Sequence, residues 1–191
     1  MSQLHHECGV AAVYQFPTAR PSEVESDLES LQKVPDQAAH LTVRMLQDMQ
    51  NRGQLAAGLT SFRPERGQLI DTYKEIGSVA EVFRLSHAKE FQALMDRYAG
   101  VAAIGHVRYA TFGKDDRSFA QPFERHHLQK LKWFSFAFNG QLSNFRQLAD
   151  DLMLDKEHHL ARQSDTEIIM HLLSEQLSAV PRLSFREIMH N

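Results

Sequence analysis

The chain has 191 residues, of which 42% are hydrophobic and 24% charged, and its formal net charge is −3. This is the composition of an ordinary soluble protein, and the length predicts a single domain. The net charge excludes the broad basic face of a nucleic-acid-binding protein. No apolar run approaches the roughly 20 residues of a transmembrane helix, so we expect no membrane partner.

Cys8 is the only cysteine, which excludes an internal disulfide framework and favours a reducing compartment. Residues 1–7 lack the basic start and apolar centre of a secretory signal, so we expect a cytoplasmic protein. The histidines show no spacing typical of metal ligands, and we expect no metal site in this segment.

The first elements differ sharply in composition. Residues 9–16 are small, β-branched or aromatic and carry no charge, which predicts a buried strand. Residues 17–36 are rich in proline and acidic side chains, which predicts a solvated loop or short helix at the rim. Residues 37–50 have the apolar spacing of a helix.

The apolar residues of this helix indicate which of its faces is buried. Leu41, Met45 and Met49 recur every four residues, so we expect them to face the core, with Val34, Ala38 and Leu46 close to that side. The helix is expected to stop at residues 51–53. Gly53 is expected there to take the left-handed conformation common after helices.

Two strands and a helix are predicted next. The strands cover 55–63 and 68–74, with a turn at 64–67 between them. The helix covers 86–98, with Ser86 as its N-cap. Its inward-facing residues are expected to be Phe91, Leu94 and Met95.

In the second half of the chain, predicted strands and helices alternate less regularly. Buried strands are predicted over 101–109 and 132–140, and the second ends in Asn-Gly. Helices are predicted over 144–154 and 164–178, and a further one begins within 183–190. Because strands and helices are mixed without a βαβ repeat, we expect an α+β fold in which sheets stack against helices.

Cys8 stands directly before the first predicted strand. If the chain were cleaved before it, one carbon would carry both a thiol nucleophile and an α-amine. That amine titrates near ~8, close to the pH at which a general base works. The alternative is a small buried hydrophobic residue, which is the usual role of a lone free cysteine.

Polar residues follow two other strands and open a helix. Arg108 to Thr111 end one strand, Asn139-Gly140 end another, and Ser164 to Glu167 begin a helix. Each alone has a simple explanation, namely a surface cation, a tight turn and a capping box. Together with Cys8 they match the needs of amide hydrolysis: a nucleophile, oxyanion donors and charges that hold the substrate.

Six motifs in this order resemble a known family. They are Glu7-Cys8-Gly9-Val10, Asn51-Arg52-Gly53-Gln54-x-Ala56-Ala57-Gly58, Gly105-His106-Val107-Arg108-Tyr109-x-Thr111, Ala120-Gln121-Pro122-Phe123, Phe138-Asn139-Gly140-x-Leu142-x-Asn144 and Ser164-Asp165-Thr166-Glu167. The chain resembles the class II glutamine amidotransferases, which are N-terminal-nucleophile hydrolases. Within that family it is most similar to the glutaminase half of amidophosphoribosyltransferase, as residues 74–83 also indicate.

The resemblance implies a four-layer αββα sandwich. Residues 1–7 would be a propeptide removed by self-cleavage, and residues 8–191 the type 2 glutamine amidotransferase domain. The C-terminal part of that fold and the phosphoribosyltransferase domain are absent from these 191 residues, so we expect a fold truncated at its C-terminus.

The resemblance also implies roles for individual residues. Cys8 would be the nucleophile, and the Asn139 side chain with the Gly140 N–H would form the oxyanion hole. Arg108 would bind the α-carboxylate of glutamine and Asp165 its α-ammonium, which agrees with the fixed cation and anion that a zwitterion requires. The other implied substrate-binding residues are Arg52, Gly53 and Thr111.

The implied reaction is hydrolysis of glutamine to glutamate and ammonia. The ammonia would convert phosphoribosyl pyrophosphate to phosphoribosylamine in purine synthesis, in a phosphoribosyltransferase domain or chain that uses Mg²⁺. A homo-oligomer is expected for the full-length protein, and no cofactor in this segment. Three alternatives stay open: a silent remnant that regulates or binds a partner, the glutaminase domain of another class II amidotransferase, and an amidase for another amide.

Overall fold

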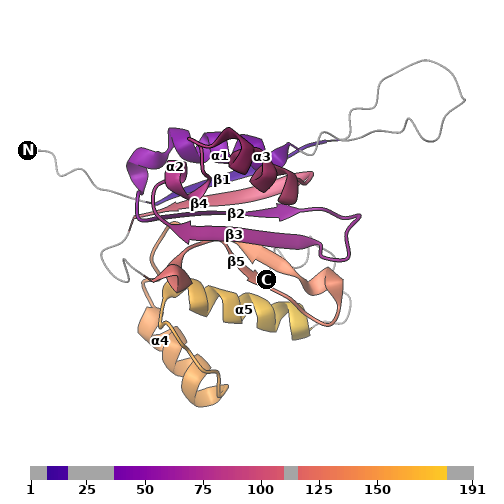
Figure 1. The fold of residues 1–191 in the computed structure, drawn as a ribbon. Coiled ribbons are helices and arrows are strands. Elements are labelled where there is room, and N and C mark those ends of the chain that lie inside the picture. Colours follow the sequence, from indigo (N-terminus) through magenta and orange to yellow (C-terminus); the bar gives the residue numbers. More distant parts are fainter. Residues whose placement is uncertain (1–7, 17–36, 110–115, 180–191) are drawn as a thin grey trace, which may run out of the picture.

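A computed structural model describes residues 8–16, 37–109 and 116–179 (Figure 1). The predictions for 1–7, 17–36, Thr111 and 183–190 lie outside the described residues. None of the helices within the described ranges is both long enough and apolar enough to cross a membrane.

The central sheet has four antiparallel strands in the order β1-β4-β2-β3. Each strand confirms a predicted one. Their bounds are Gly9–Tyr14 for β1, Ala56–Phe62 for β2, Ile70–Ile76 for β3 and Ala102–Arg108 for β4.

Three helices cover one face of this sheet (Figure 1). They are α1 (Ala38–Asp48), α2 (Val79–Val82) and α3 (Ala88–Arg97). The main core lies between the helices and the sheet, and its largest fully buried side chains include Leu46, Leu59, Phe83 and Met95.

A second sheet and a helix lie on the opposite face (Figure 1). The sheet consists of β5 (Phe123–Arg125) paired with β6 (Phe134–Phe136), and α5 (Asp165–Ala179) packs against it. Helix α4 (Phe145–Asp150) continues into a π-helical turn at Asp151–Asp155, and short 3₁₀ turns lie at Gln50–Arg52, Arg117–Phe119 and Lys130–Lys132. The layers run helix, sheet, sheet, helix, which confirms the predicted αββα sandwich.

The strand register brings distant segments to one end of the central sheet. Gly9 pairs with Val107, and Ala56 pairs with both Arg108 and Ile76. The start of β1, the end of β4 and the start of β2 therefore meet at one place.

An apolar groove lies at the opposite end of the sandwich. It has a volume of about 640 Å³ and lies between the two sheets. Its walls include Tyr14, Phe62, Ile104 and Trp133. This groove is thus separate from the place where β1, β4 and β2 meet.

The buried face of α1 differs from the prediction. Met49 packs partly against the core, as expected. Leu41 and Met45 are instead 39% and 42% exposed, so their prediction as core residues was wrong. The face toward the sheet is formed by Ala38, Ala39, Thr42, Val43 and Leu46. Of these, Ala38 and Leu46 had been expected close to the buried side.

Three local predictions were also wrong. Ser86 does not cap α3, whose N-cap is His87 without a side-chain hydrogen bond. The predicted strand at 132–140 is regular only over β6, because a 3₁₀ turn precedes it and an irregular segment follows. Gly53 is extended rather than left-handed, with φ −161° and ψ 131°.

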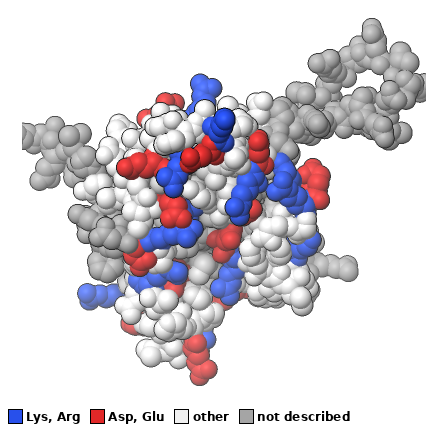
Figure 2. Space-filling model, in the orientation of Figure 1, with Lys and Arg blue, Asp and Glu red and all other residues white. Residues whose placement is uncertain are grey.

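Charged side chains of both signs are mixed on the face that Figure 2 shows. Lys and Arg residues lie next to Asp and Glu residues and do not gather into one patch. This face therefore has the mixed charge of an ordinary protein surface.

Candidate active site

Cys8 is the meeting point of three chain segments. The thiol is free and half-buried, and its Sγ lies 3.4 Å from the carbonyl oxygen of Tyr109. The carbonyl oxygen of Cys8 accepts two hydrogen bonds, from Arg52 Nε at 3.1 Å and from Asn139 Nδ2 at 2.8 Å. These contacts fix the backbone of Cys8 while its sulfur stays partly accessible.

Arg52 and Gly53 reach this place because α1 ends in a 3₁₀ turn. Gly53 then packs directly on the end of β4, where an added Cβ would lie 2.4 Å from the carbonyl carbon of Arg108. The next contact is from the N–H of Leu55 to the carbonyl of Arg108, at 3.1 Å. Glycine is needed here for close backbone approach, not for a left-handed conformation.

Arg108 ends β4 as a buried cation, with 9% of its surface exposed. Its guanidinium lies over the ring of Phe119, 5.3 Å from the ring centroid. Burial lowers the pKa of Arg108, and the nearby groups of Cys8 and Asp116 act in the opposite direction. Because an arginine stays protonated in proteins, this is a fixed positive charge beside Cys8.

Asn139 and Gly140 follow β6 and are exposed. Their position depends on the preceding residue, Phe138, whose backbone is held on both sides by one side chain. Gln121 accepts a hydrogen bond from the N–H of Phe138 at 2.7 Å and donates one to its carbonyl at 3.2 Å. The Asn139 amide is thereby placed against Cys8.

Asp165 is the first residue of α5, and its Oδ2 accepts a hydrogen bond from the N–H of Leu142 at 3.1 Å. Leu142 is two residues beyond Gly140, so the carboxylate is tied to the loop that carries the candidate oxyanion donors. A carboxylate at a helix N-terminus is favoured by the helix dipole.

The predicted capping box at this helix is only half present. Ser164 Oγ accepts a hydrogen bond from the N–H of Glu167 at 3.3 Å. The buried carboxylate of Glu167 accepts instead from the three backbone N–H groups of residues 161–163. Glu167 therefore holds the preceding loop in place and does not cap the helix in return.

The structure thus brings most of the predicted site residues to one end of the sandwich. Arg52 and Asn139 contact Cys8 directly, and Gly53 packs on Arg108. Gly140 adjoins Asn139 in the chain. Asp165 accepts a hydrogen bond from Leu142, in the loop that follows Gly140. Thr111 lies outside the described residues.

Sequence reasoning missed several neighbours of the site. Phe119 lies against Arg108, Gln121 holds Phe138, and Lys74 holds the residues around Gln121. Gln121 lies in the motif from Ala120 to Phe123, and Phe119 directly precedes it. No role had been assigned to this motif from the sequence. The signal for Gln121 was a polar residue inside the otherwise apolar run from Ala120 to Phe123.

Within the described ranges, no group of three or more His, Cys, Asp or Glu side chains is arranged to hold a metal ion.

A comparison with protein-family models finds one match. Residues 92–181 match the family described as "Glutamine amidotransferase domain". This range contains Arg108, Asn139, Gly140 and Asp165.

Several curated relatives are amidophosphoribosyltransferases. The chain is 30% identical to chloroplastic amidophosphoribosyltransferase 1 of Arabidopsis thaliana over 169 residues, which are 88% of this chain and 24% of the relative. It is 33% identical to the amidophosphoribosyltransferase of Escherichia coli over 129 residues, covering 68% of this chain and 23% of that protein. Identity to the Archaeoglobus fulgidus protein of that name is 37% over 144 residues, covering 73% and 28%.

Solved structures give the same result. One, described as the allosteric regulatory enzyme of purine biosynthesis, matches with a TM-score of 0.65 and 27% identity, over 81% of this chain and 30% of that one. Another, glutamine phosphoribosylpyrophosphate amidotransferase from B. subtilis complexed with ADP and GMP, has a TM-score of 0.60 and 27% identity, over 78% and 29%. The chain spans about a quarter of the length of the curated relatives, 24% in the first case. The chain belongs to the class II glutamine amidotransferases and corresponds to the glutaminase region of the amidophosphoribosyltransferases.

Proposed function

We propose that this chain hydrolyses glutamine to glutamate and ammonia, with Cys8 as the nucleophile. The observation that carries the proposal is the surroundings of Cys8. A half-buried thiol begins a strand beside a buried arginine, and its carbonyl is held by Arg52 and Asn139. Nucleophile, cation and amide donor are thereby gathered from three separate segments.

The reaction proceeds in two steps. The Cys8 sulfur attacks the side-chain carbonyl carbon of glutamine, and the thiol proton passes to the α-amine of Cys8. The Asn139 side chain and the Gly140 N–H stabilise the oxyanion. The protonated amine then gives its proton to the leaving nitrogen, ammonia departs, and a thioester remains. Water attacks the thioester and the amine accepts a proton from it. The amine then returns this proton to the departing sulfur, so that glutamate is released and the thiol and the free amine are regenerated.

Two charges select glutamine over a neutral amide. Arg108 binds the α-carboxylate through its planar fork, and Asp165 binds the α-ammonium. Both are held by the protein, Arg108 by burial and Asp165 by the N–H of Leu142. Arg52, Gly53 and Thr111 complete the walls of the substrate pocket in this proposal.

The α-amine of Cys8 can act as the base only after the chain is cleaved between Glu7 and Cys8. In the 191-residue chain the nitrogen of Cys8 is part of the peptide bond to Glu7 and cannot accept a proton. We therefore propose that residues 1–7 are a propeptide and that residues 8–191 are the amidotransferase domain.

The names of the relatives indicate which molecule accepts the ammonia. The relatives are named amidophosphoribosyltransferases, and this supports phosphoribosyl pyrophosphate as the acceptor. We propose that a phosphoribosyltransferase domain or chain, working with Mg²⁺, receives the ammonia, and that the complete assembly is a homo-oligomer in the cytoplasm.

Three measurements test the proposal. Intact mass shows whether residues 1–7 are lost, an enzymatic glutamate assay shows whether glutamine is hydrolysed, and a diazoketone analogue of glutamine shows whether Cys8 reacts. In the wild type we expect loss of residues 1–7, hydrolysis of glutamine and labelling of Cys8. In Cys8→Ala we expect neither hydrolysis nor labelling. An unprocessed, unreactive chain would favour a silent binding module. Labelling that glutamine does not block would favour an amidase for another substrate.

A further inference from the structure

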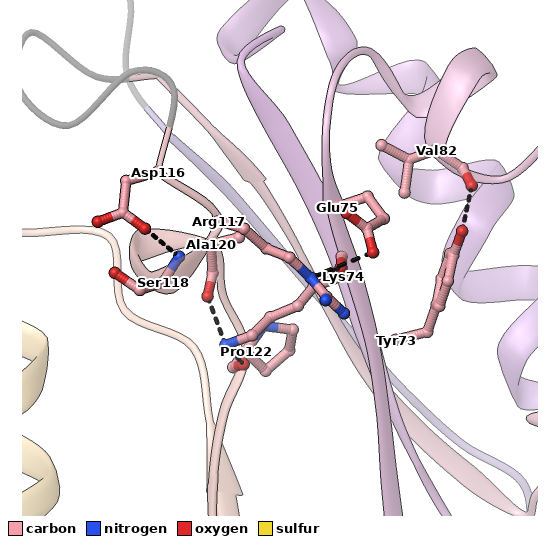
Figure 3. Close-up of polar contacts among 9 residues, drawn as sticks. All are labelled: Tyr73, Lys74, Glu75, Val82, Asp116, Arg117, Ser118, Ala120 and Pro122. Carbon is pink, nitrogen blue, oxygen red and sulfur yellow. Dashed lines mark hydrogen bonds and ion pairs between the residues drawn. The ribbon is translucent and has the colours of Figure 1, made fainter.

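Residues 120–122 are anchored to the central sheet at three successive carbonyls. The ammonium of Lys74, on β3, donates to the carbonyls of Ala120 at 2.7 Å and Pro122 at 3.0 Å (Figure 3). The carbonyl between them, that of Gln121, packs on Gly58 of β2, where an added Cβ would lie only 2.4 Å from it. The backbone of Gln121 is thus fixed on the sheet.

Lys74 is well suited to this anchoring. Its ammonium also lies over the ring of Phe123, 4.3 Å from the ring centroid. Burial is the main cause that lowers the pKa of Lys74 to about 8, and Arg162 adds to it. At neutral pH the group is therefore mainly charged, and hydrogen bonds from a charged donor are about twice as strong as neutral ones.

The side chain of Gln121, two residues before β5, reaches from this anchored backbone to the segment that follows β6 in the second sheet. It is 7% exposed and pairs with both polar groups of the Phe138 backbone, as a neighbouring strand would. Phe138 directly precedes Asn139, whose side chain contacts Cys8. The three parts form a continuous connection from β3 through Gln121 to the nucleophile.

We infer that Gln121 is a positioning residue that sets the place of the Asn139 and Gly140 oxyanion donors. It touches neither Cys8 nor Asn139 directly, and it acts through the backbone of Phe138. The kinetic consequence rests on the proposed function, since an oxyanion forms only if glutamine is hydrolysed. The structural consequence, a fixed Phe138 backbone, does not depend on it.

The first test replaces Gln121 by methionine in the 191-residue chain, which keeps the length of the side chain and removes both hydrogen bonds. Displaced oxyanion donors should lower kcat for glutamine roughly 10-fold to 100-fold. The KM should stay within about threefold, because Arg108 and Asp165 are unchanged. Gln121→Glu keeps the acceptor for the Phe138 N–H, so its kcat should lie between those of wild type and Q121M.

A double-mutant cycle decides whether Gln121 acts through Asn139. In the N139A background, adding Q121M should lower kcat by a clearly smaller factor than it does in wild type, because one of the two donors that Gln121 positions is already gone and only the Gly140 N–H remains to be displaced. Multiplicative effects of the two changes would overturn the inference.

Ser135→Ala is the matched control. Ser135 lies on β6, three residues before Phe138. Its hydroxyl also makes two hydrogen bonds, one across the layers to Thr60 Oγ1 and one within the second sheet to the Phe123 carbonyl, both at 2.9 Å. S135A should lose stability as Q121M does but keep its kcat. Equal losses of kcat in S135A and Q121M would show a general loss of packing instead.

Amide hydrogen exchange separates this inference from the proposed function. The Phe138 N–H should exchange at least about 10-fold faster in Q121M than in wild type and be unchanged in S135A. If wild type did not hydrolyse glutamine, the proposed function would fail, and the exchange rate would still decide the role of Gln121. Unchanged protection of Phe138 in Q121M would overturn the inference whatever the activity.

Discussion

The side chain of Asn139 donates a hydrogen bond to the backbone carbonyl of Cys8 at 2.8 Å, although the two residues are 131 positions apart. This bond uses one of the two hydrogens of the amide nitrogen. The second can serve the oxyanion that forms when Cys8 attacks a substrate. A single asparagine can therefore both fix the nucleophile and stabilise its transition state.

Replacing Asn139 by alanine tests this double role. We expect kcat for glutamine hydrolysis to fall on the order of 100-fold to 1,000-fold, with a much smaller change in KM, because the lost donor acts mainly in the transition state. Steady-state glutaminase kinetics measure both constants. Gln92→Ala removes an exposed amide on α3 that donates a hydrogen bond to Asp96, and it should change neither constant. A KM effect larger than the kcat effect in N139A would contradict an oxyanion role.

Replacing Arg108 should affect binding instead. In the proposed function Arg108 pairs with the substrate carboxylate, so removing this buried cation should raise KM for glutamine roughly 100-fold. Arg108→Lys keeps the charge but loses the planar fork, so its KM should be intermediate. Arg66→Ala, at the exposed turn between β2 and β3, is the control and should have wild-type KM. The hypothesis of a carboxylate site would be wrong if R108A bound glutamine normally in a folded protein, as checked by circular dichroism.

The packing of Gly53 on Arg108 predicts a coupled loss of stability and activity. In Gly53→Ala the new Cβ would meet the carbonyl carbon of Arg108 at 2.4 Å. Backbone atoms cannot rotate away, so we expect about 1–3 kcal/mol of destabilisation and a shifted Arg108. Urea unfolding and glutaminase kinetics measure the two effects.

Gly67 provides the comparison for this change. It lies in the turn between β2 and β3, where an added Cβ has nothing within 4 Å. Gly67→Ala should change the free energy of unfolding by less than about 0.5 kcal/mol. Equal behaviour of the two variants would refute the close approach at Gly53.

Much of the fold could be predicted from the sequence because strands β1, β2 and β4 consist mostly of small and apolar residues. The motif residues Cys8, Arg108, Asn139 and Asp165 could also be named, because each lies at one end of a predicted strand or at the start of a predicted helix. The contacts of Gln121 could not be foreseen. They depend on how residues 120–122 lie on Gly58 and Lys74, which are far away in the sequence.

The buried face of α1 was predicted wrongly for a related reason. Apolar residues recur at helical spacing on two of its faces, so the periodicity alone does not choose between them. The opposing strand decides. Gly105 on β4 leaves room only for close contact, and an added Cβ there would lie 2.5 Å from Thr42 and 2.9 Å from Leu46. The face with the smaller side chains therefore packs on the sheet.

This difference between the two faces can be measured. Leu46 is fully buried, so Leu46→Ala should cost about 2–5 kcal/mol of unfolding free energy. Met45, 42% exposed on the neighbouring face, is the matched position, and Met45→Ala should cost less than about 1 kcal/mol. Urea denaturation of both variants gives the comparison, and a reversed order would restore the face expected from the sequence.

His106 predicts a specific pH dependence of stability. The side chain lies inside the sandwich, and neither ring nitrogen has a hydrogen-bond partner among the described residues. Burial lowers the pKa of His106 from 6.5 to about 4, and the nearby backbone of Phe138 opposes this only in part. The unfolded chain therefore binds a proton near pH 6.5 that the folded protein does not take up until about pH 4.

The free energy of unfolding should fall as the pH is lowered through this window. The contribution of His106 is fully present above pH 6.5 and is lost progressively toward pH 4, by about 3 kcal/mol in all. Urea unfolding at several pH values between 7 and 4 measures the slope. In His106→Gln the slope should be smaller by up to one proton, whereas His87→Gln, at an exposed position, should follow wild type. If H106Q kept the full acid sensitivity, groups other than this buried imidazole would account for it.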